Sequence, residues 1–103
     1  MSDKPVTMVR IYLTEGKHQY QELLKLLHDR EQIAGVTAFR GIVGFGQSGI
    51  LHSSSLLDLS LDLPIILEFF DTPEKVSQVL VHLDSLIKPG HIVSWPATVN
   101  SGE

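Results

Sequence analysis

The sequence predicts an α+β domain of the ferredoxin-like type, with the element order βαββαβ and two helices on one face of a four-stranded antiparallel sheet. Four segments carry apolar residues with period 2, and two other segments carry them at helical spacing. The chain has 103 residues, of which 43% are hydrophobic, and this suffices for one modest core. We therefore expect a single domain that spans residues 1–103.

The first predicted strand spans residues 6–13, and a helix follows at about 18–32. The strand has a strongly apolar face made of Val9, Ile11 and Leu13. The helix has an apolar stripe at positions i, i+3, i+4 and i+7, made of Tyr20, Leu23, Leu24 and Leu27. Ala34 and Gly35 come next, and we expect the glycine to stop this helix.

The second predicted strand spans residues 36–45 and leads into a long flexible loop at 46–60. Glycines are frequent between Gly35 and Gly49, and glycine suits a backbone that turns sharply or approaches a ligand closely. Three serines flanked by leucines follow, a composition that fits neither a capped helix nor an alternating strand. We expect this loop to carry function.

The third predicted strand spans about 61–70 and is apolar at every odd position, which is typical of a core strand. A second helix is predicted after Thr72, whose hydroxyl suits the N-cap, with Pro73 at the first helical position. The apolar stripe of this helix is made of Val76, Val79, Leu80 and Leu83. The helix is expected to continue to about residue 87, before Pro89 and Gly90 end it.

The last predicted strand spans residues 92–99. One of its faces is made of Val93, Trp95, Ala97 and Val99. Pro96 has no N–H to donate, so this strand belongs at an edge of the sheet. The spatial order 4-1-3-2, counting the strands along the chain, satisfies this requirement.

The second face of the predicted sheet is too apolar to be left in water. It carries Met8, Arg10, Tyr12, Ile66, Glu68 and Phe70. Because the first and third strands are neighbours, Arg10 and Glu68 are expected to pair across them. Exposed apolar patches of this kind usually mark an interface, so we expect this face to be buried in an oligomer. A solvated sheet face is the alternative.

Composition excludes several classes of protein. The formal charge of −4, with only eight Lys and Arg, argues against a nucleic-acid-binding surface. The absence of cysteine excludes disulfides, thiolate metal sites and thiol catalysis. We expect no membrane insertion, because the longest mainly apolar run is far shorter than a membrane helix requires. The first residues lack the apolar segment of a signal peptide, so the expected location is the cytoplasm.

The segment from Gly44 to Gly49 matches the pattern G-x-G-x-x-G literally. A dinucleotide-binding fingerprint must close a strand and open a helix, and the residues after Gly49 have no helical pattern. We therefore reject a Rossmann site. The segment is either a glycine-rich strand end that feeds a loop or an anion-binding turn of free backbone N–H groups.

Two stretches carry a family resemblance: Gly-Val-Thr-Ala-Phe-Arg-Gly-Ile-Val-Gly-Phe-Gly from Gly35, and Leu-Asp-Leu-Ser-Leu-Asp-Leu-Pro from Leu57, with Ile50-Leu51-His52 between them. Together they resemble the signature of a family of small bacterial and archaeal domains of unknown function. That family is related in fold to the PII nitrogen-signalling proteins. The resemblance covers about residues 10–93 and implies a PII-like fold and a homotrimer whose sheets face inward.

In PII proteins a similar Gly-Phe-Gly begins the long regulatory loop, whose base lines a nucleotide cleft between subunits. By position, the resemblance assigns that base to Gly44, Phe45, Gly46, Gln47 and Ser48. PII proteins place a Gly-Lys pair after the second helix to meet the phosphates. This chain has Gly90-His91 there, so the implied cation is a titratable imidazole.

The chain also departs from the PII pattern. It lacks the arginine-rich segment near the C-terminus, which argues against ATP in particular. It also has no tyrosine in the loop, which argues against uridylylation. The expected ligand is therefore an adenine nucleotide (AMP, ADP or ATP), with the less charged ones favoured. The alternative is that the chain binds no nucleotide. Arg40 lies mid-strand, where it serves either a cross-strand or intersubunit salt bridge or a ligand.

Other candidate chemistry is weaker. The five histidines have no metal-ligand spacing, so a metal site within one subunit is not expected. They are His18, His28, His52, His82 and His91. Ser53, Ser54 and Ser55 have no nucleophile elbow, so they indicate a flexible loop rather than catalysis.

The sequence therefore favours a non-enzymatic, PII-like regulatory protein. We expect it to bind a small-molecule effector between subunits and a protein target through residues 48–60. The alternatives are a ferredoxin-fold enzyme of acylphosphatase type and a trimeric metal-binding protein. The first alternative requires an arginine in the loop after the first strand, where the sequence reads Thr-Glu-Gly-Lys-His.

Overall fold

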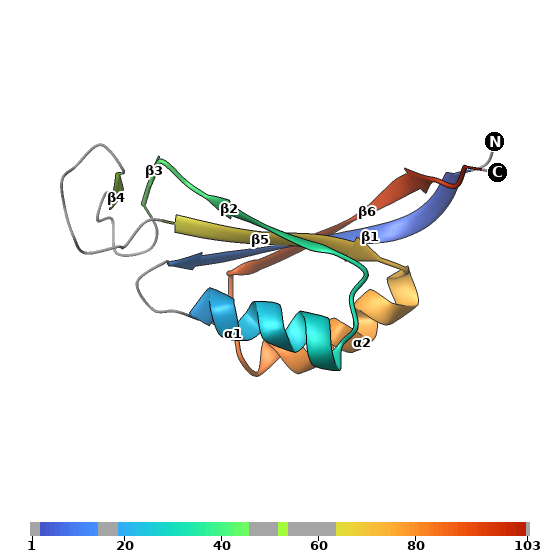
Figure 1. Cartoon of the computed structure of the whole chain (residues 1–103), viewed down its shortest axis with the longest axis horizontal. Coiled ribbons are helices and arrows are strands. Elements are labelled where there is room, and N and C mark those ends of the chain that lie inside the picture. Colours follow the sequence, from blue (N-terminus) through green and yellow to red (C-terminus); the bar gives the residue numbers. More distant parts are fainter. Residues whose placement is uncertain (1–2, 15–18, 46–51, 54–63, 103) are drawn as a thin grey trace.

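The computed structural model describes residues 3–14, 19–45, 52–53 and 64–102. Four strands form one antiparallel sheet in the order β2-β5-β1-β6. They are β2 (Val36–Arg40), β5 (Pro64–Asp71), β1 (Asp3–Thr14) and β6 (Ile92–Asn100). Helices α1 (Gln19–Lys25) and α2 (Pro73–Asp84) lie on one face of this sheet (Figure 1). The predicted fold class and strand order are confirmed, the order being read from the opposite edge.

The core lies between the helices and the odd-numbered residues of the two central strands. β1 pairs with β5 from Thr7↔Asp71 to Thr14↔Pro64, and paired residues share a face. The strands contribute buried Val9, Ile11, Leu13, Ile65, Leu67 and Phe69, and the helices contribute Leu23, Leu27, Val76, Val79 and Leu83. The helical stripes and the core strand predicted from the sequence are therefore confirmed.

The edge position predicted for the last strand is confirmed. β6 pairs only with β1, from Asp3↔Asn100 to Ile11↔Ile92, and Pro96 lies opposite Thr7. Beyond the end of β5, β1 and β6 continue together as a two-stranded ribbon that carries the described ends of the chain (Figure 1).

Helix α2 begins as predicted and ends earlier. The Oγ1 of Thr72 accepts a hydrogen bond from the N–H of Lys75 at 3.2 Å, and Pro73 occupies the first helical position. The N–H groups of Leu86 and Ile87 both donate to the carbonyl of Leu83, at 2.9 and 3.0 Å. These bonds close the helix at Asp84 rather than near residue 87.

The first helix ends through tertiary contacts and not at Gly35, so the predicted glycine stop is wrong. After α1 the chain continues as a π-helical turn, η2 (Leu26–Arg30). Gln32 then adopts a left-handed backbone with φ of 56°. Its carbonyl accepts a hydrogen bond from the Nζ of Lys75 at 2.8 Å, and Ile33 is buried beside it. Contacts with α2 and the core thus fix the reversal.

The second strand is shorter than predicted. β2 ends at Arg40, and β3 (Val43–Gly44) pairs with β4 (His52–Ser53) instead of with the main sheet. At Gly41 an added Cβ would lie 2.6 Å from the Cγ of Pro64, and the N–H of Gly41 donates to the carbonyl of Pro64 at 2.7 Å. The chain leaves the sheet at this close approach. Apart from β4, the predicted loop at 46–60 and residues 61–63 lie outside the described residues.

Candidate functional site

The turn between α2 and β6 holds two of the predicted ligand residues. Gly90 has φ of 87°, a left-handed conformation that favours glycine. The N–H of His91 donates to the carbonyl of Lys88 at 3.2 Å, and its carbonyl accepts from the N–H of Tyr12 at 2.9 Å. The Nδ1 of His91 lies 3.0 Å from the carbonyl oxygen of Tyr12. His91 is therefore fixed to β1 by its backbone and by one ring nitrogen.

An open hollow of about 350 Å³ lies against this turn. It is lined by Asp84, Ile87, Lys88, Pro89, Gly90 and Ile92. Small-molecule sites typically begin near about 300 Å³, so the hollow can hold part of a ligand such as a nucleotide. Asp84 and Lys88 are the two charged residues among those that line it. Neither residue was singled out from the sequence, because only a helix C-terminus folded against a strand brings them together.

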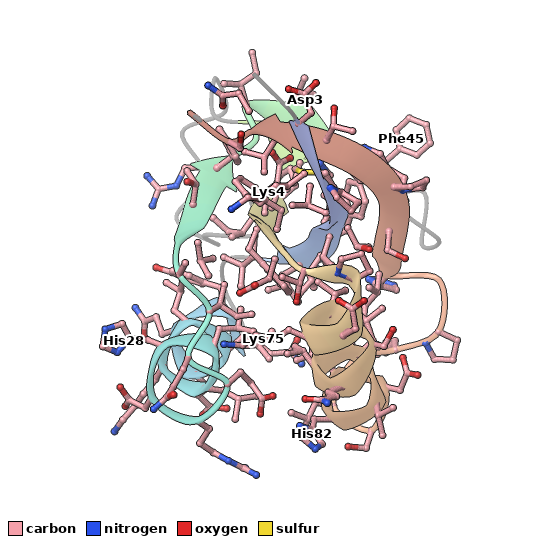
Figure 2. All side chains as sticks on the ribbon, turned by 90° about the vertical axis from the view of Figure 1, so that its right-hand side faces the viewer. Asp3, Lys4, His28, Phe45, Lys75 and His82 are labelled. Carbon is pink, nitrogen blue, oxygen red and sulfur yellow. The ribbon has the colours of Figure 1, made fainter. Side chains whose placement is uncertain are left out.

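The other predicted ligand residues lie where β2 leaves the sheet. Gly44 is in β3, opposite His52. Phe45 is 74% exposed and projects away from the helices (Figure 2). Arg40 is exposed and lies opposite Ile65. The remaining three predicted residues, Gly46, Gln47 and Ser48, lie outside the described residues.

The two groups of residues share one end of the sheet but not one edge. Arg40 and Leu13 are both in register with Ile65, while Ile11 is in register with Ile92, so β2 ends near the level at which β6 begins. These two strands are the opposite edges of the sheet, separated by three strand spacings or roughly 14 Å.

The sheet face opposite the helices is apolar and uncovered by the described residues (Figure 1). Its exposed residues include Tyr12 (39%), Phe39 (49%), Phe70 (44%) and Val93 (45%). The sequence identified Tyr12 and Phe70 on this face. Phe39 and Val93 join them because they lie opposite Ile66 and Arg10 in the register, which the pattern within one strand does not reveal.

The predicted pair of Arg10 and Glu68 is present in the middle of this face. Nε and Nη2 of Arg10 both donate to Oε2 of Glu68, the Nε bond at 2.9 Å. The Cζ of Arg10 lies 5.5 Å from the ring centroid of Trp95, within the range of a cation–π contact. Its hydrogen bond with Glu68, and a second interaction with Tyr12, raise the pKa of the Arg10 guanidinium. The guanidinium is therefore held charged and in place.

Two described histidines lie on the helical layer, away from the candidate residues (Figure 2). Nδ1 of His82 lies 3.1 Å from both carboxylate oxygens of Glu31, and Nδ1 of His28 lies 2.7 Å from Oδ1 of Asp29. Within the described ranges, no three His, Asp or Glu side chains gather as metal ligands would. No helix in the same part of the chain is long and apolar enough to span a bilayer.

Known proteins share this fold. CPII, a nitrogen regulatory PII-like protein from Thiomonas intermedia, was solved bound to ADP, AMP and bicarbonate. It superposes with a TM-score of 0.68 at 19% identity, over 98% of this chain and 93% of CPII. The divalent ion tolerance protein CutA1 from Ehrlichia chaffeensis superposes with a TM-score of 0.58 at 10% identity, over 93% and 82% of the two chains. At these identities the comparisons establish the fold.

Sequence similarity establishes the family. The chain is 35% identical over 102 residues to a UPF0166 protein of Methanocaldococcus jannaschii, and the match covers 93% of each protein. Residues 6–99 match the DUF190 family, which is described as "Uncharacterized ACR, COG1993". The resemblance to a PII-like family of small domains is thereby confirmed. The chain belongs to the DUF190 family, and its fold is PII-like.

Proposed function

We propose that this protein is a PII-like regulatory subunit that binds an adenine nucleotide in clefts between copies of the chain. The observation that carries the proposal is the placement of the candidate residues. Gly44 and Phe45 lie beyond one edge strand and Gly90 and His91 at the start of the other, at the same end of the sheet. When the β2 edge of one copy meets the β6 edge of the next, the two groups face each other.

The open sheet face supports the assembly that this cleft requires. Its four most exposed apolar residues, given above, surround an ion pair that is already satisfied within the chain. Such a face gains free energy when it is covered by apolar surface and needs no charge from a partner. A ring of three copies with these faces inward, a homotrimer, covers it and also closes all its edge contacts.

We assign no catalytic role to the protein, and we propose that it signals by contact. The segment at 48–60 is the proposed site for a protein target, on the basis of its apolar and serine-rich sequence. Of this segment only His52 and Ser53 belong to the described residues, as β4. The fold of CPII, which was solved with ADP and AMP, supports an adenine nucleotide as the effector.

Calorimetric titration with AMP, ADP and ATP tests nucleotide binding, and mixed assemblies test whether the site lies between copies. Phe45→Asp and His91→Asp each place a carboxylate on one side of the cleft, where it repels the ligand phosphates. Each variant alone is expected to lose binding. Co-refolded in equal amounts, the two variants restore about one quarter of the wild-type sites, because random mixing pairs two intact edges in that fraction of clefts.

Two results would contradict the proposal. If none of the three nucleotides binds the wild-type protein, adenine-nucleotide recognition is wrong. If nucleotide binds but the mixture recovers no sites, the cleft is not shared between copies. Circular dichroism of each variant serves as the control for folding.

A further inference from the structure

Glu31 and His82 form a polar contact between the two helical segments of the chain. Nδ1 of His82, on α2, lies 3.1 Å from each carboxylate oxygen of Glu31, the residue that follows η2. The side chain of Glu31 is 8% exposed, and that of His82 is 53% exposed. Among the described residues, this imidazole is the one side-chain partner of the carboxylate. A carboxylate that is largely shielded from water is therefore held by a group that titrates near neutral pH.

The turn that carries Glu31 depends on contacts with α2. Gln32 has φ of 56°, a left-handed conformation that is unfavourable for a residue with a side chain. The carbonyl of Gln32 accepts a hydrogen bond from the Nζ of Lys75 at 2.8 Å, and Glu31 contacts His82. Lys75 and His82 are seven residues apart, so they lie on the same side of α2 (Figure 2). One side of α2 thus holds two successive residues of the turn.

The hydrogen bond between His82 and Glu31 is compatible with both charge states of the imidazole. An ionised carboxylate only accepts hydrogen bonds, so Nδ1 of His82 is the donor. Nδ1 carries hydrogen both in the protonated ring and in one neutral tautomer, and protonation then occurs at Nε2. The added positive charge attracts a carboxylate from which most water is excluded, so the contact is stronger in the protonated state.

We propose that Glu31 and His82 form a pH-sensitive clamp between η2 and α2, which tightens when the imidazole takes up a proton. The clamp needs neither a nucleotide nor a second copy of the chain, so it does not rest on the proposed function. An imidazole ordinarily has a pKa near 6.5 and a glutamate carboxylate one near 4.3. The stabilising contribution of the clamp is therefore present at pH 5.5 and is lost as the pH rises to 8.

Among the described residues, the other charged side chains around the clamp come from both helical segments and from the sheet. Lys75 contributes an ammonium group beside the same turn, and a lysine charge does not change between pH 5.5 and 8. Asp71 of β5 lies at the other end of α2, where its Oδ1 accepts from the N–H of Thr72 at 2.8 Å. The remaining charged side chains of the helical segments are exposed: Glu22, Lys25, His28, Asp29, Arg30, Glu74 and Asp84. Within the clamp, His82 is the group whose charge changes in this pH range.

A double-mutant cycle at two pH values tests the clamp. His82→Gln, Glu31→Gln and the double variant are unfolded with urea at pH 5.5 and at pH 8, at one protein concentration. Glutamine retains hydrogen-bonding groups but does not titrate. The coupling between the two sites, measured as a factor in the unfolding equilibrium constant, is expected to be about threefold larger at pH 5.5, a modest factor because the imidazole is half exposed. Coupling that is equal at both pH values, or larger at pH 8, overturns the inference.

His28 and Asp29 provide a matched control pair within the same chain. Nδ1 of His28 lies 2.7 Å from Oδ1 of Asp29, and the two side chains are 85% and 52% exposed. The two residues are neighbours in sequence, so their contact joins no separate segments and is also available to the unfolded chain. The cycle of His28→Gln and Asp29→Asn is expected to show the same coupling at both pH values. If this pair shows the pH dependence expected of Glu31 and His82, the clamp is not its cause and the inference is wrong.

Nitrogen-15 NMR of the wild-type protein tests the same contact without a substitution. At pH 8 the spectrum is expected to show hydrogen on Nδ1 of His82 and none on Nε2. The opposite tautomer overturns the clamp, because Nδ1 then has no hydrogen to donate to Glu31.

Native-state hydrogen exchange tests whether the clamp holds the turn itself. The N–H of Ile33 donates to the carbonyl of Leu27 at 3.0 Å and closes this turn. His82→Gln is expected to lower the protection of that N–H, relative to its intrinsic exchange rate, and to do so more at pH 5.5 than at pH 8. His28→Gln is expected to leave it unchanged. If His82→Gln has no effect on the protection of Ile33 at pH 5.5, the contact does not clamp the turn and the inference is overturned.

Discussion

The two faces of the central sheet are both apolar, yet a single chain covers only one of them. On the helix-covered face Val9, Ile11 and Leu67 have no exposed surface. On the other face Tyr12 and Phe39 remain 39% and 49% exposed. Neighbouring strand positions alternate between the two faces, and both sets of positions carry apolar side chains. The covered face thus accounts for the fold, and the open face is the surface that we propose for association between chains.

The faces also differ in their polar groups. No polar or charged residue is buried in the part of the chain that the structure describes, so the buried part of the covered face is apolar. The open face carries Arg10 and Glu68, whose side chains are 38% and 22% exposed. An ion pair at this depth adds little to the stability of one chain. In the proposed assembly another copy covers this pair, and removal of either partner would then leave an unpaired buried charge.

The largest predicted effect separates the two faces by their contribution to folding. Leu67→Ala opens a cavity at a fully buried position, and it is expected to lower the free energy of unfolding by about 3 kcal/mol. Ile66→Ala, the matched variant one residue away on the open face, shortens a side chain that is partly buried in one chain and that the proposed assembly would cover further. Urea unfolding at several protein concentrations distinguishes them, because the cost at Ile66 rises with concentration and the cost at Leu67 does not. Equal, concentration-independent costs would show that the faces do not differ.

Ile66→Asp tests the open face as an interface. The new carboxylate lies among apolar side chains on β5, and covering it with another copy costs several kcal/mol unless it is paired. We expect the variant to be monomeric by light scattering at micromolar concentration, with an unchanged circular dichroism spectrum. Gln78→Asp on the exposed surface of α2 is the control, and it should leave the assembly intact. A monomeric wild-type protein, or an assembled Ile66→Asp variant, would remove this interface.

The features that were predictable from the sequence are those that depend on patterns within one element. The alternation around Val9 and the hydroxyl-proline start at Thr72 each specify an element locally. The pairing of Arg10 with Glu68 was also predictable, because the strand order follows from the βαββαβ arrangement and makes their strands neighbours. The residues that complete the open face needed the register, which depends on turns that no local pattern determines.

The features that were missed depend on contacts between distant segments. Gln32 carries the left-handed turn because Lys75, 43 residues later, holds its carbonyl. The ring of His91 contacts the carbonyl oxygen of Tyr12, 79 residues earlier in the chain. Lys88 belongs to the candidate site because the end of α2 and the start of β6 line one hollow. Residue type and spacing contain no signal for these contacts.

The smallest predicted effect concerns Gly41, where the chain leaves the sheet and both of its faces end. At Gly41 the chain leaves the sheet against Pro64, and an added Cβ would lie 2.6 Å from the Cγ of that proline. Either the ring or the backbone must then shift, so Gly41→Ala is expected to lower the free energy of unfolding by about 1 kcal/mol. Gly35→Ala is the matched control, since an added Cβ there has no neighbour within 4 Å. That control should be neutral or stabilising by about 0.5 kcal/mol, because alanine restricts the unfolded chain. Urea denaturation of both variants at one protein concentration measures the difference. A Gly41→Ala variant as stable as Gly35→Ala would show that the close approach to Pro64 does not hold the end of β2 in place.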